Sequence, residues 1–265
     1  MKRRRRGVAC ALGATLLTLL SSVHARADLA QIKKRGVLRT LVRPGRPELF
    51  TTEAGAPPGL EHEILLGFAK RHGVKLEAVA VASQAARLTD LLGSKGDVIG
   101  LTNTAFLGEP IAFSSEIIPT RFVVVTRKPH RVVKTLQELY KEKIGVVKGA
   151  DNVDVLIGAG VPAAQIHDEF VAPAVALKEG KLTALVWAVD KAVLFQQKDP
   201  SYQLGMFVGP PAGRAFAVRR EDKELLAALN QHIEILRSTD VWNRLLVKYF
   251  GTTAQDVLRM GRPAR

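Results

Sequence analysis

The sequence predicts an α/β protein with two lobes, a cleft between them and two chain crossings at the hinge. Short β-prone runs alternate with helical periodicity from residue 28 onward, and the same alternation restarts after residue 128. Two longer β-prone runs, Phe122–Arg127 and Ala215–Arg219, separate the two sets. Alternating strands and helices imply parallel sheets, so we expect each set to form a lobe with its own core. The segment 128–214 should then fold alone.

Residues 1–27 have the pattern of a secretory signal peptide. Lys2 to Arg6 form a positive n-region, Val8 to Leu20 an apolar h-region, and Ala25-Arg26-Ala27 an A-x-A cleavage site. The apolar run is interrupted by Gly and Thr and is too short to span a bilayer. We therefore expect the mature chain to begin at Asp28 and to reside in the periplasm.

Composition limits the classes of partner. With 265 residues and 47% hydrophobic content, the chain can bury a large core. The formal charge of +14 falls to +8 without the six positive residues of the signal, and the remaining ones are scattered, so we expect no nucleic-acid partner. Cys10, the only cysteine, lies in the signal. The mature chain then has no thiol for a disulfide, a zinc site or nucleophilic catalysis.

The first set of elements is a short helix followed by a βαβαβ pattern. Apolar residues recur at helical spacing in the helices, and Gly, Pro or polar residues bound the strands. The loop Arg43–Phe50 follows the first strand, at the sheet edge where ligands bind in open α/β sheets. The expected ranges are Asp28–Lys34, Leu38–Val42, Leu60–His72, Leu76–Val81, Gln84–Leu92 and Asp97–Leu101.

The second set repeats this pattern, and two terminal helices follow it. Thr135 is a candidate N-cap, Pro200 ends the last helix of the set, and Gly251 is a candidate C-cap for the terminal pair. The expected helices are Leu136–Tyr140, Asn152–Ile157, Ala174–Glu179, Lys191–Lys198, Lys223–Arg237 and Asp240–Phe250, and the expected strands are Ile144–Val147, His167–Val171 and Leu185–Val189.

Motifs for catalysis and for metal binding are incomplete. His62-Glu63 begins like a zinc-protease helix, but Leu66 stands where the second histidine is needed. Gly158-Ala159-Gly160 follows a predicted helix rather than a strand and lacks the third glycine of a dinucleotide loop. We therefore expect no enzyme activity, no metal and no cofactor. Surface or helix-end positions are expected for His72, His130 and His232.

Two stretches carry a family resemblance. RGVLRTLVRP followed by PGLEHEILLGFAKRHGVKLEAV, and the closing AFAVRREDKELLAALNQHIEILRSTDVWNRLLVKYFG, resemble periplasmic solute-binding proteins of family 3, the amino-acid-binding type. The resemblance implies a bilobed periplasmic-binding-protein-like (type II) fold, with lobe 1 at 28–123 plus 219–265 and lobe 2 at 124–218. It also implies a monomer that captures a small solute and delivers it to an ABC permease in the inner membrane.

In lobe 1, the family holds a ligand carboxylate with a Ser/Thr-rich strand end and an arginine just after it. Thr102, Asn103 and Thr104 match the strand end, but no Arg or Lys lies between Thr104 and Phe113. An Arg–carboxylate contact is a strong charge-assisted interaction. Its absence argues against an ordinary amino acid as the ligand.

In lobe 2, the resemblance points to further departures. Ala150 and Asp151 stand at a helix N-terminus where hydroxyl residues are expected, and that end, with Asn152 next in the chain as a further candidate ligand residue, still presents N–H groups to an anion. Ala188 replaces the amine-binding aspartate, with Trp187 beside it and Asp190 two residues later. Asp190 either substitutes for that aspartate or caps the helix that follows. We favour the cap, because Asp is a preferred N-cap residue.

Arg46 lies where the family often has an aromatic residue over the ligand. It either recognises an acid from a new direction or is a solvated loop residue. Together, the departures favour a small polar solute other than an ordinary α-amino acid. A non-transport sensor or accessory protein is an alternative, because GLEHEI resembles the binding half of lytic transglycosylase F. A dehydratase-type enzyme, as cyclohexadienyl dehydratase is on the same scaffold, is a weaker one, since no acid–base pair can be named.

Export of the chain is directly testable. Protein recovered from the periplasm should begin at Asp28, because signal peptidase cleaves after an A-x-A site. Intact-mass spectrometry of that material identifies the first residue. A membrane-bound species that retains Met1 would contradict cleavage.

Overall fold

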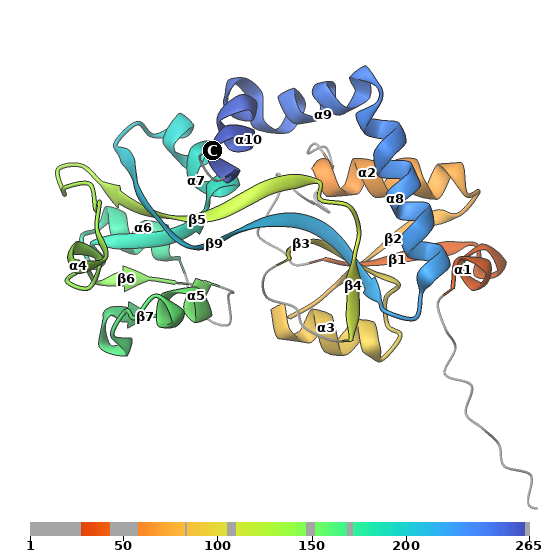
Figure 1. The fold of residues 1–265 in the computed structure, drawn as a ribbon, viewed down its shortest axis with the longest axis horizontal. Helices are drawn as coiled ribbons and strands as arrows, with labels where there is room; N and C mark the ends of the chain where they lie inside the picture. Colours follow the sequence, from red (N-terminus) through yellow and green to blue (C-terminus); the bar gives the residue numbers. More distant parts are fainter. Residues whose placement is uncertain are drawn as a thin grey trace, which may run out of the picture.

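The structure is a computed structural model and describes residues 28–42, 58–82, 84–104, 110–146, 152–168 and 172–262. Figure 1 shows two lobes side by side, with two long strands running from one to the other. The bilobed α/β architecture predicted from the sequence, with two crossings at the hinge, is confirmed.

Lobe 1 contains the N-terminal elements and two helices from near the C-terminus. Asp28 caps the first helix by accepting from the Leu29 N–H at 2.6 Å, and Gly36 ends it in the left-handed conformation, with φ 75°. The elements are α1 (Leu29–Arg35), β1 (Val37–Val42), α2 (Leu60–Arg71), β2 (Lys75–Ala80), α3 (Gln84–Leu92), β3 (Val98–Asn103), β4 (Ile111–Phe113), α8 (Lys223–Arg237) and α9 (Asp240–Phe250).

Lobe 2 consists of short elements, and two long strands connect it to lobe 1. Thr135 caps the first helix as predicted, because its hydroxyl accepts from the Glu138 N–H at 3.3 Å. The lobe 2 elements are α4 (Leu136–Leu139), β6 (Ile144–Gly145), α5 (Asn152–Gly158), η1 (Ala163–Gln165), β7 (Ile166–His167), α6 (Pro173–Lys178), β8 (Ala184–Ala188) and α7 (Val189–Lys198); the long strands are β5 (Ile118–Arg127) and β9 (Tyr202–Arg219).

The strands of the described chain join into one continuous sheet. Their order is β2-β1-β3-β9-β5-β8-β6-β7, and β4 pairs with β9 beside this path. The prediction that 128–214 folds alone is therefore wrong, because it required separate sheets. Val123 and Val125 of β5, which that segment omits, also pack in the lobe 2 core.

Strand β9 is far longer than the sequence suggested. Between the pairs Thr120–Ala212 and Phe122–Val208, β9 carries two more residues than β5, so its register shifts there. The extra length holds Gly209, Pro210 and Pro211. Proline cannot donate to a ladder, and it is tolerated where a strand bulges away from its partner. These residues therefore mask the strand in the sequence without breaking it in the structure.

The last part of β9 belongs to the sheet of lobe 1. Ala215 pairs with Thr102 in β3, and Val218 pairs with Ala112 in β4. Phe216 and Val218 pack in the lobe 1 core. The division of the chain at residues 123 and 218 stays a prediction, and this pairing favours a second boundary near residue 214.

His232 lies in the core rather than at the surface, so the surface interpretation of this residue is wrong. It is 4% exposed, and its Nε2 lies 3.0 Å from the Ile64 carbonyl of α2. The ring meets Phe68 edge-on at 5.8 Å between centroids. Burial lowers the pKa of His232, so the neutral ring is the form that joins α2 to α8. His130 pairs with Glu142, and His72 is the C-cap of α2.

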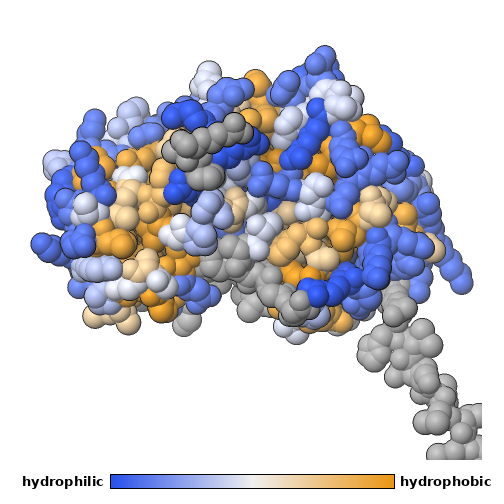
Figure 2. Space-filling model, in the orientation of Figure 1, coloured by the Kyte–Doolittle hydropathy of each residue, from blue (hydrophilic) through white to orange (hydrophobic). Residues whose placement is uncertain are grey.

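A further helix, α10 (Ala254–Gly261), returns from lobe 1 across the hinge after the short turn η2 (Gly251–Thr253). It packs against β5 and α7, as Figure 1 shows. Met260 touches core side chains of both lobes, and Gln197 of α7 donates to the Thr252 hydroxyl at 3.1 Å. On the face seen in Figure 2, strongly hydrophilic residues gather around this helix. The C-terminal segment therefore supports the hinge from outside.

A buried ion pair lies at the C-terminal end of β9, in lobe 1. Asp222 is 1% exposed, and its Oδ2 lies 2.9 Å from Nε of Arg219, the last residue of β9. Burial raises the pKa of the Asp222 carboxyl to about 6, although Arg219 opposes the shift. The folded state therefore binds a proton that the unfolded chain releases near pH 3.8. Stability from this group is fully present below that pH and is lost as pH rises through about 6.

The variant Asp222→Asn removes this titration. At about 1.36 kcal/mol per pKa unit, wild type should lose about 3 kcal/mol relative to the variant between pH 2 and pH 8. Urea unfolding at several pH values measures the difference. The control Asp240→Asn changes an exposed carboxylate and should leave the pH dependence unchanged. Parallel curves for wild type and Asp222→Asn would contradict the assignment.

Candidate functional site

The carboxyl end of β3 lies where the sheet of lobe 1 meets the hinge. All six residues of this strand are buried, as expected for a strand covered on both faces. Thr102 is 1% exposed, and its hydroxyl accepts from Nη2 of Arg87 at 3.3 Å. Arg87 belongs to α3 and is itself 7% exposed. A guanidinium therefore stands beside the strand end that the sequence predicted as a ligand-binding position.

Thr104 is held by the hinge. Its hydroxyl accepts from the Gly213 N–H of β9 at 3.1 Å, and its own N–H donates to the Gly213 carbonyl at 2.9 Å. These two bonds attach the end of β3 to the middle of the crossing strand. The Thr104 hydroxyl thus has a structural partner in this conformation.

The start of α2 is held against the same strand. Glu61 is 4% exposed and accepts from the Leu101 N–H at 2.8 Å. A Cβ at Gly100 would lie 1.9 Å from the Glu61 carboxylate, so only glycine allows this approach. The helix that follows the loop Arg43–Phe50 is therefore fixed beside Thr102.

Arg214 connects the hinge to lobe 2. It faces Asn103 of β3 across the sheet, and its guanidinium donates twice to Asp190, from Nε to Oδ2 at 2.9 Å and from Nη2 to Oδ1 at 3.0 Å. The Thr120 hydroxyl of β5 donates to the same Oδ1 at 3.3 Å. Asp190 has no exposed surface. One buried ion pair therefore links β9, β5 and α7.

The N-cap interpretation of Asp190 is wrong. Helix α7 begins at Val189, its N-cap is Ala188, and no side chain caps it. Asp190 is the second residue of the helix. Its position in the first turn places its carboxylate against the Arg214 guanidinium. An acid near a helix N-terminus is still favoured by the helix dipole.

Asn152 and Trp187 lie on the two faces of β8. Asn152 is 6% exposed, and its Nδ2 donates to the Val186 carbonyl at 2.6 Å. The Trp187 ring packs in the opposite layer, 4.6 Å from the Phe195 ring, with the Lys191 ammonium 4.5 Å from its centroid. Trp187 is 6% exposed. In this conformation the tryptophan is a core residue of lobe 2.

The structure brings four of the predicted residues together and leaves others apart. Arg46 and Asp151 lie outside the described residues, so their ligand roles stay predictions. The group at the hinge comprises Thr102, Asn103, Thr104 and Asp190, with Asn152 and Trp187 further into lobe 2.

Sequence reasoning missed two arginines at this site. Arg87 sits in an amphipathic helix and Arg214 in a β-prone run, where each resembles an ordinary surface charge. A signal for Arg214 was its position inside the apolar stretch of β9, since a charge within a buried strand needs a partner. No comparable signal marked Arg87.

The described residues of this site offer groups for polar recognition. Among the residues that the structure describes, no three His, Cys, Asp or Glu side chains group closely enough to hold a metal ion. The same part of the chain contains no helix long and apolar enough to cross a membrane. What the described residues provide is hydroxyl, amide and guanidinium groups at the ends of strands.

The sequence matches the family described as bacterial extracellular solute-binding proteins, family 3, over residues 38–252. That range covers most of the chain. The chain belongs to this family. Family 3 solute-binding proteins are extracellular or periplasmic, and most are binding proteins without enzyme activity.

Curated relatives of this family 3 protein carry another name. The chain is 25% identical over 246 residues to the membrane-bound lytic murein transglycosylase F of Pseudomonas putida strain KT2440. The aligned region covers 89% of the chain and 50% of that protein. The corresponding protein of strain W619 is 26% identical with the same coverage. The chain therefore spans about half the length of the curated relatives it matches.

Solved structures share the fold of this family 3 protein. A mutant of ArgBP from T. maritima matches with a TM-score of 0.71 and 25% identity over 84% of this chain and 98% of that one. The solute receptor for L-cysteine of Neisseria gonorrhoeae matches with a TM-score of 0.75 over 90% of this chain and 100% of that one. At 21% identity, the second match shows the fold alone.

The Arg214–Asp190 pair should stabilise the fold. Removing one member of a buried pair leaves an uncompensated charge, so Asp190→Ala and Arg214→Ala should each lower the free energy of unfolding by about 3–5 kcal/mol. The double variant should lose less than the sum, since the two side chains interact. Urea unfolding of the three variants measures this coupling.

The exposed pair Asp256 and Arg259 of α10 is the control, and its removal should change the free energy of unfolding by about 0–1 kcal/mol. If Asp190→Ala kept its stability but lost ligand binding, the structural role would be contradicted. Asp190 would then be a ligand-binding residue.

Proposed function

We propose that this family 3 protein captures a small polar acid between its lobes and that the acid lacks an α-ammonium group. The observation that carries this proposal is the engagement of Asp190 by Arg214 and Thr120. The proposal includes no chemical step. The proposed role includes export to the periplasm and delivery to an ABC permease, which membership of family 3 supports.

The described residues offer poor partners for the α-ammonium group of an amino acid. Ala188 ends β8 where the family resemblance places an aspartate. Asp190 is buried, and its carboxylate accepts from two side chains. An ammonium would have to displace Arg214 from a buried, bidentate contact. A ligand without an ammonium avoids that exchange.

The acid side is better supplied. Arg87 brings a guanidinium to the Thr102 hydroxyl at the end of β3. A carboxylate that displaced the hydroxyl as acceptor would gain a charge-assisted hydrogen bond in a buried setting. We therefore infer that Arg87 takes the role of the arginine missing after Thr104. Arg46 adds to this role if it faces the same ligand.

A second candidate is an accessory protein that binds a cell-wall fragment. The similarity to lytic murein transglycosylase F over 89% of the chain favours it. The chain matches half of those proteins, so this second candidate includes binding of the fragment and no lytic activity. Muropeptides also carry carboxylates, and one screen compares both candidates.

A thermal-shift screen of the mature protein separates these functions. Organic acids, amino acids, sugars and muropeptide fragments are added singly, because a ligand that binds only the folded state raises the unfolding midpoint. A small acid that raises the midpoint supports the first candidate. A muropeptide that does so while small acids do not would replace it with the second.

The twenty common α-amino acids should bind more weakly than about 10 μM, which corresponds to about −7 kcal/mol. A charged contact contributes roughly 1.5–3 kcal/mol, and the aspartate that would bind the ammonium is absent from its expected position. Isothermal titration calorimetry measures the constants. A tighter constant for any amino acid would overturn the proposed ligand class.

Arg87→Gln should weaken binding of the acid found in the screen by about tenfold or more, because a charged hydrogen bond is lost. Arg71→Gln removes an exposed arginine of α2 and serves as the matched control. Equal affinity of both variants would exclude Arg87 from the site.

A further inference from the structure

A cavity of about 430 Å³ lies beside the hinge, where the end of α10 meets β5 and β9. Its walls are formed mainly by Pro119 of β5, by Pro211 to Gly213 of β9 and by Gly261, with Thr104 at one side. Of the residues predicted for ligand binding, only Thr104 lines it. The cavity therefore adjoins the site proposed above at Thr104 and shares no other predicted ligand residue with it.

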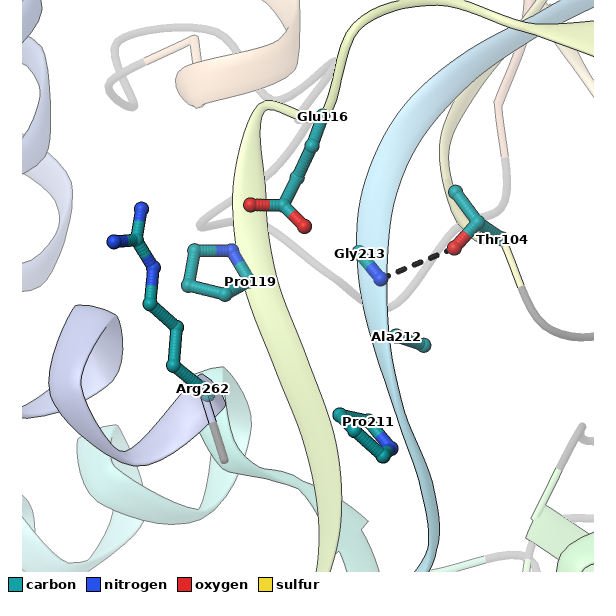
Figure 3. Close-up of a pocket in the computed structure, with 8 residues that line it drawn as sticks. Thr104, Glu116, Pro119, Pro211, Ala212, Gly213 and Arg262 are labelled. Carbon is teal, nitrogen blue, oxygen red and sulfur yellow. Dashed lines mark hydrogen bonds between the residues drawn. The ribbon is translucent and has the colours of Figure 1, made fainter. Parts of the chain in front are cut away.

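Two opposite charges enter this cavity from different elements. Glu116 precedes β5, and Arg262 follows α10. Figure 3 shows both side chains extending along β5 on either side of Pro119, with their charged groups directed toward the same space. They do not form an ion pair with each other, and neither side chain bonds to another described residue. The guanidinium of Arg237 donates to the backbone carbonyl of Glu116 and not to its carboxylate.

Two glycines set the positions of these charges. A Cβ at Gly213 would lie 2.6 Å from Oε2 of Glu116, so the bare backbone of β9 makes room for the carboxylate. A Cβ at Gly261 would lie 2.4 Å from the Pro119 carbonyl, so glycine lets the end of α10 rest on β5. That contact fixes the point from which Arg262 projects.

We propose that this cavity is a second binding site and that it takes a small zwitterion whose ammonium and carboxylate are separated along a chain. The ammonium would bind Glu116, and the carboxylate would bind the Arg262 guanidinium through two N–H groups. The two protein charges line the same cavity without forming an ion pair, so a ligand that carries both opposite charges can bridge them. An α-amino acid carries both groups on one carbon, whereas a longer chain lets them lie further apart. An ω-amino acid has such a chain.

The cavity has a charged side chain from each of two elements, and most of its other lining residues have small or cyclic side chains. Two prolines, an alanine and two glycines form the walls between the charges. These five residues carry no polar side chain, so Glu116, Arg262 and Thr104 provide the polar side chains of the cavity. The ligand would contact both hinge strands and α10 at once.

Isothermal titration of the full mature chain with β-alanine, γ-aminobutyrate, δ-aminovalerate and ε-aminocaproate tests the proposal. One chain length should bind best, with a dissociation constant at or below about 1 mM, since two charged contacts form. Amines and acids of the same length that lack the second charge should bind about tenfold more weakly or worse. Absence of binding across the series, or equal binding of the singly charged analogues, would overturn it.

Variants locate the site. Glu116→Gln and Arg262→Gln should each weaken the preferred zwitterion by about tenfold or more, whereas the exposed controls Glu234→Gln and Arg244→Gln should not. Gly213→Ala keeps every charge but displaces the Glu116 carboxylate, so it should weaken binding too. Arg87→Gln should leave this binding unchanged, which separates it from the cleft. Retained affinity in both Glu116→Gln and Arg262→Gln would reject the site.

Discussion

The antiparallel pairing of β5 with β9 is the interaction on which the rest of the structure depends. Side chains of β5 enter the cores of both lobes, Ile118 in lobe 1 and Val123 to Val125 in lobe 2. Strand β9 carries Arg214, which holds Asp190, and Gly213, which holds the end of β3. The candidate ligand residues of lobe 1 and the buried carboxylate of lobe 2 are therefore positioned by the same two strands.

Sequence periodicity predicted the helices well because each buries one regular face. Helices α3, α8 and α9 have the predicted bounds, and each places its apolar residues three or four apart. The sequence revealed only the last part of β9, because Gly and Pro fill the length that bulges away from β5. It did not reveal α10, because that helix is short and its burial depends on contacts with β5 and α7.

The candidate site shows a similar limit. The strand end at Thr102 was recognisable because ligands bind at the carboxyl ends of parallel strands. Arg87 and Arg214 were not, since their partners lie 15 and 24 residues away and are brought near only by the fold. The sequence left Asp190 either as a substitute for an aspartate two positions earlier or as a helix cap, and neither interpretation allowed for a helix that begins at Val189. The change from strand to helix turns its carboxylate toward the hinge.

The register shifts between β5 and β9 have a mechanical consequence. Extra residues of β9 loosen the ladder at two places, and the one at Thr120/Phe122 lies between the two cores, whereas the one at Val123/Val125 lies within the core of lobe 2. Elsewhere the strands are tied into packed cores that resist bending. Rotation of one lobe against the other is thereby confined to a narrow band, and a single angle would describe it. One pair of spectroscopic labels, one on each lobe, would suffice to follow that coordinate.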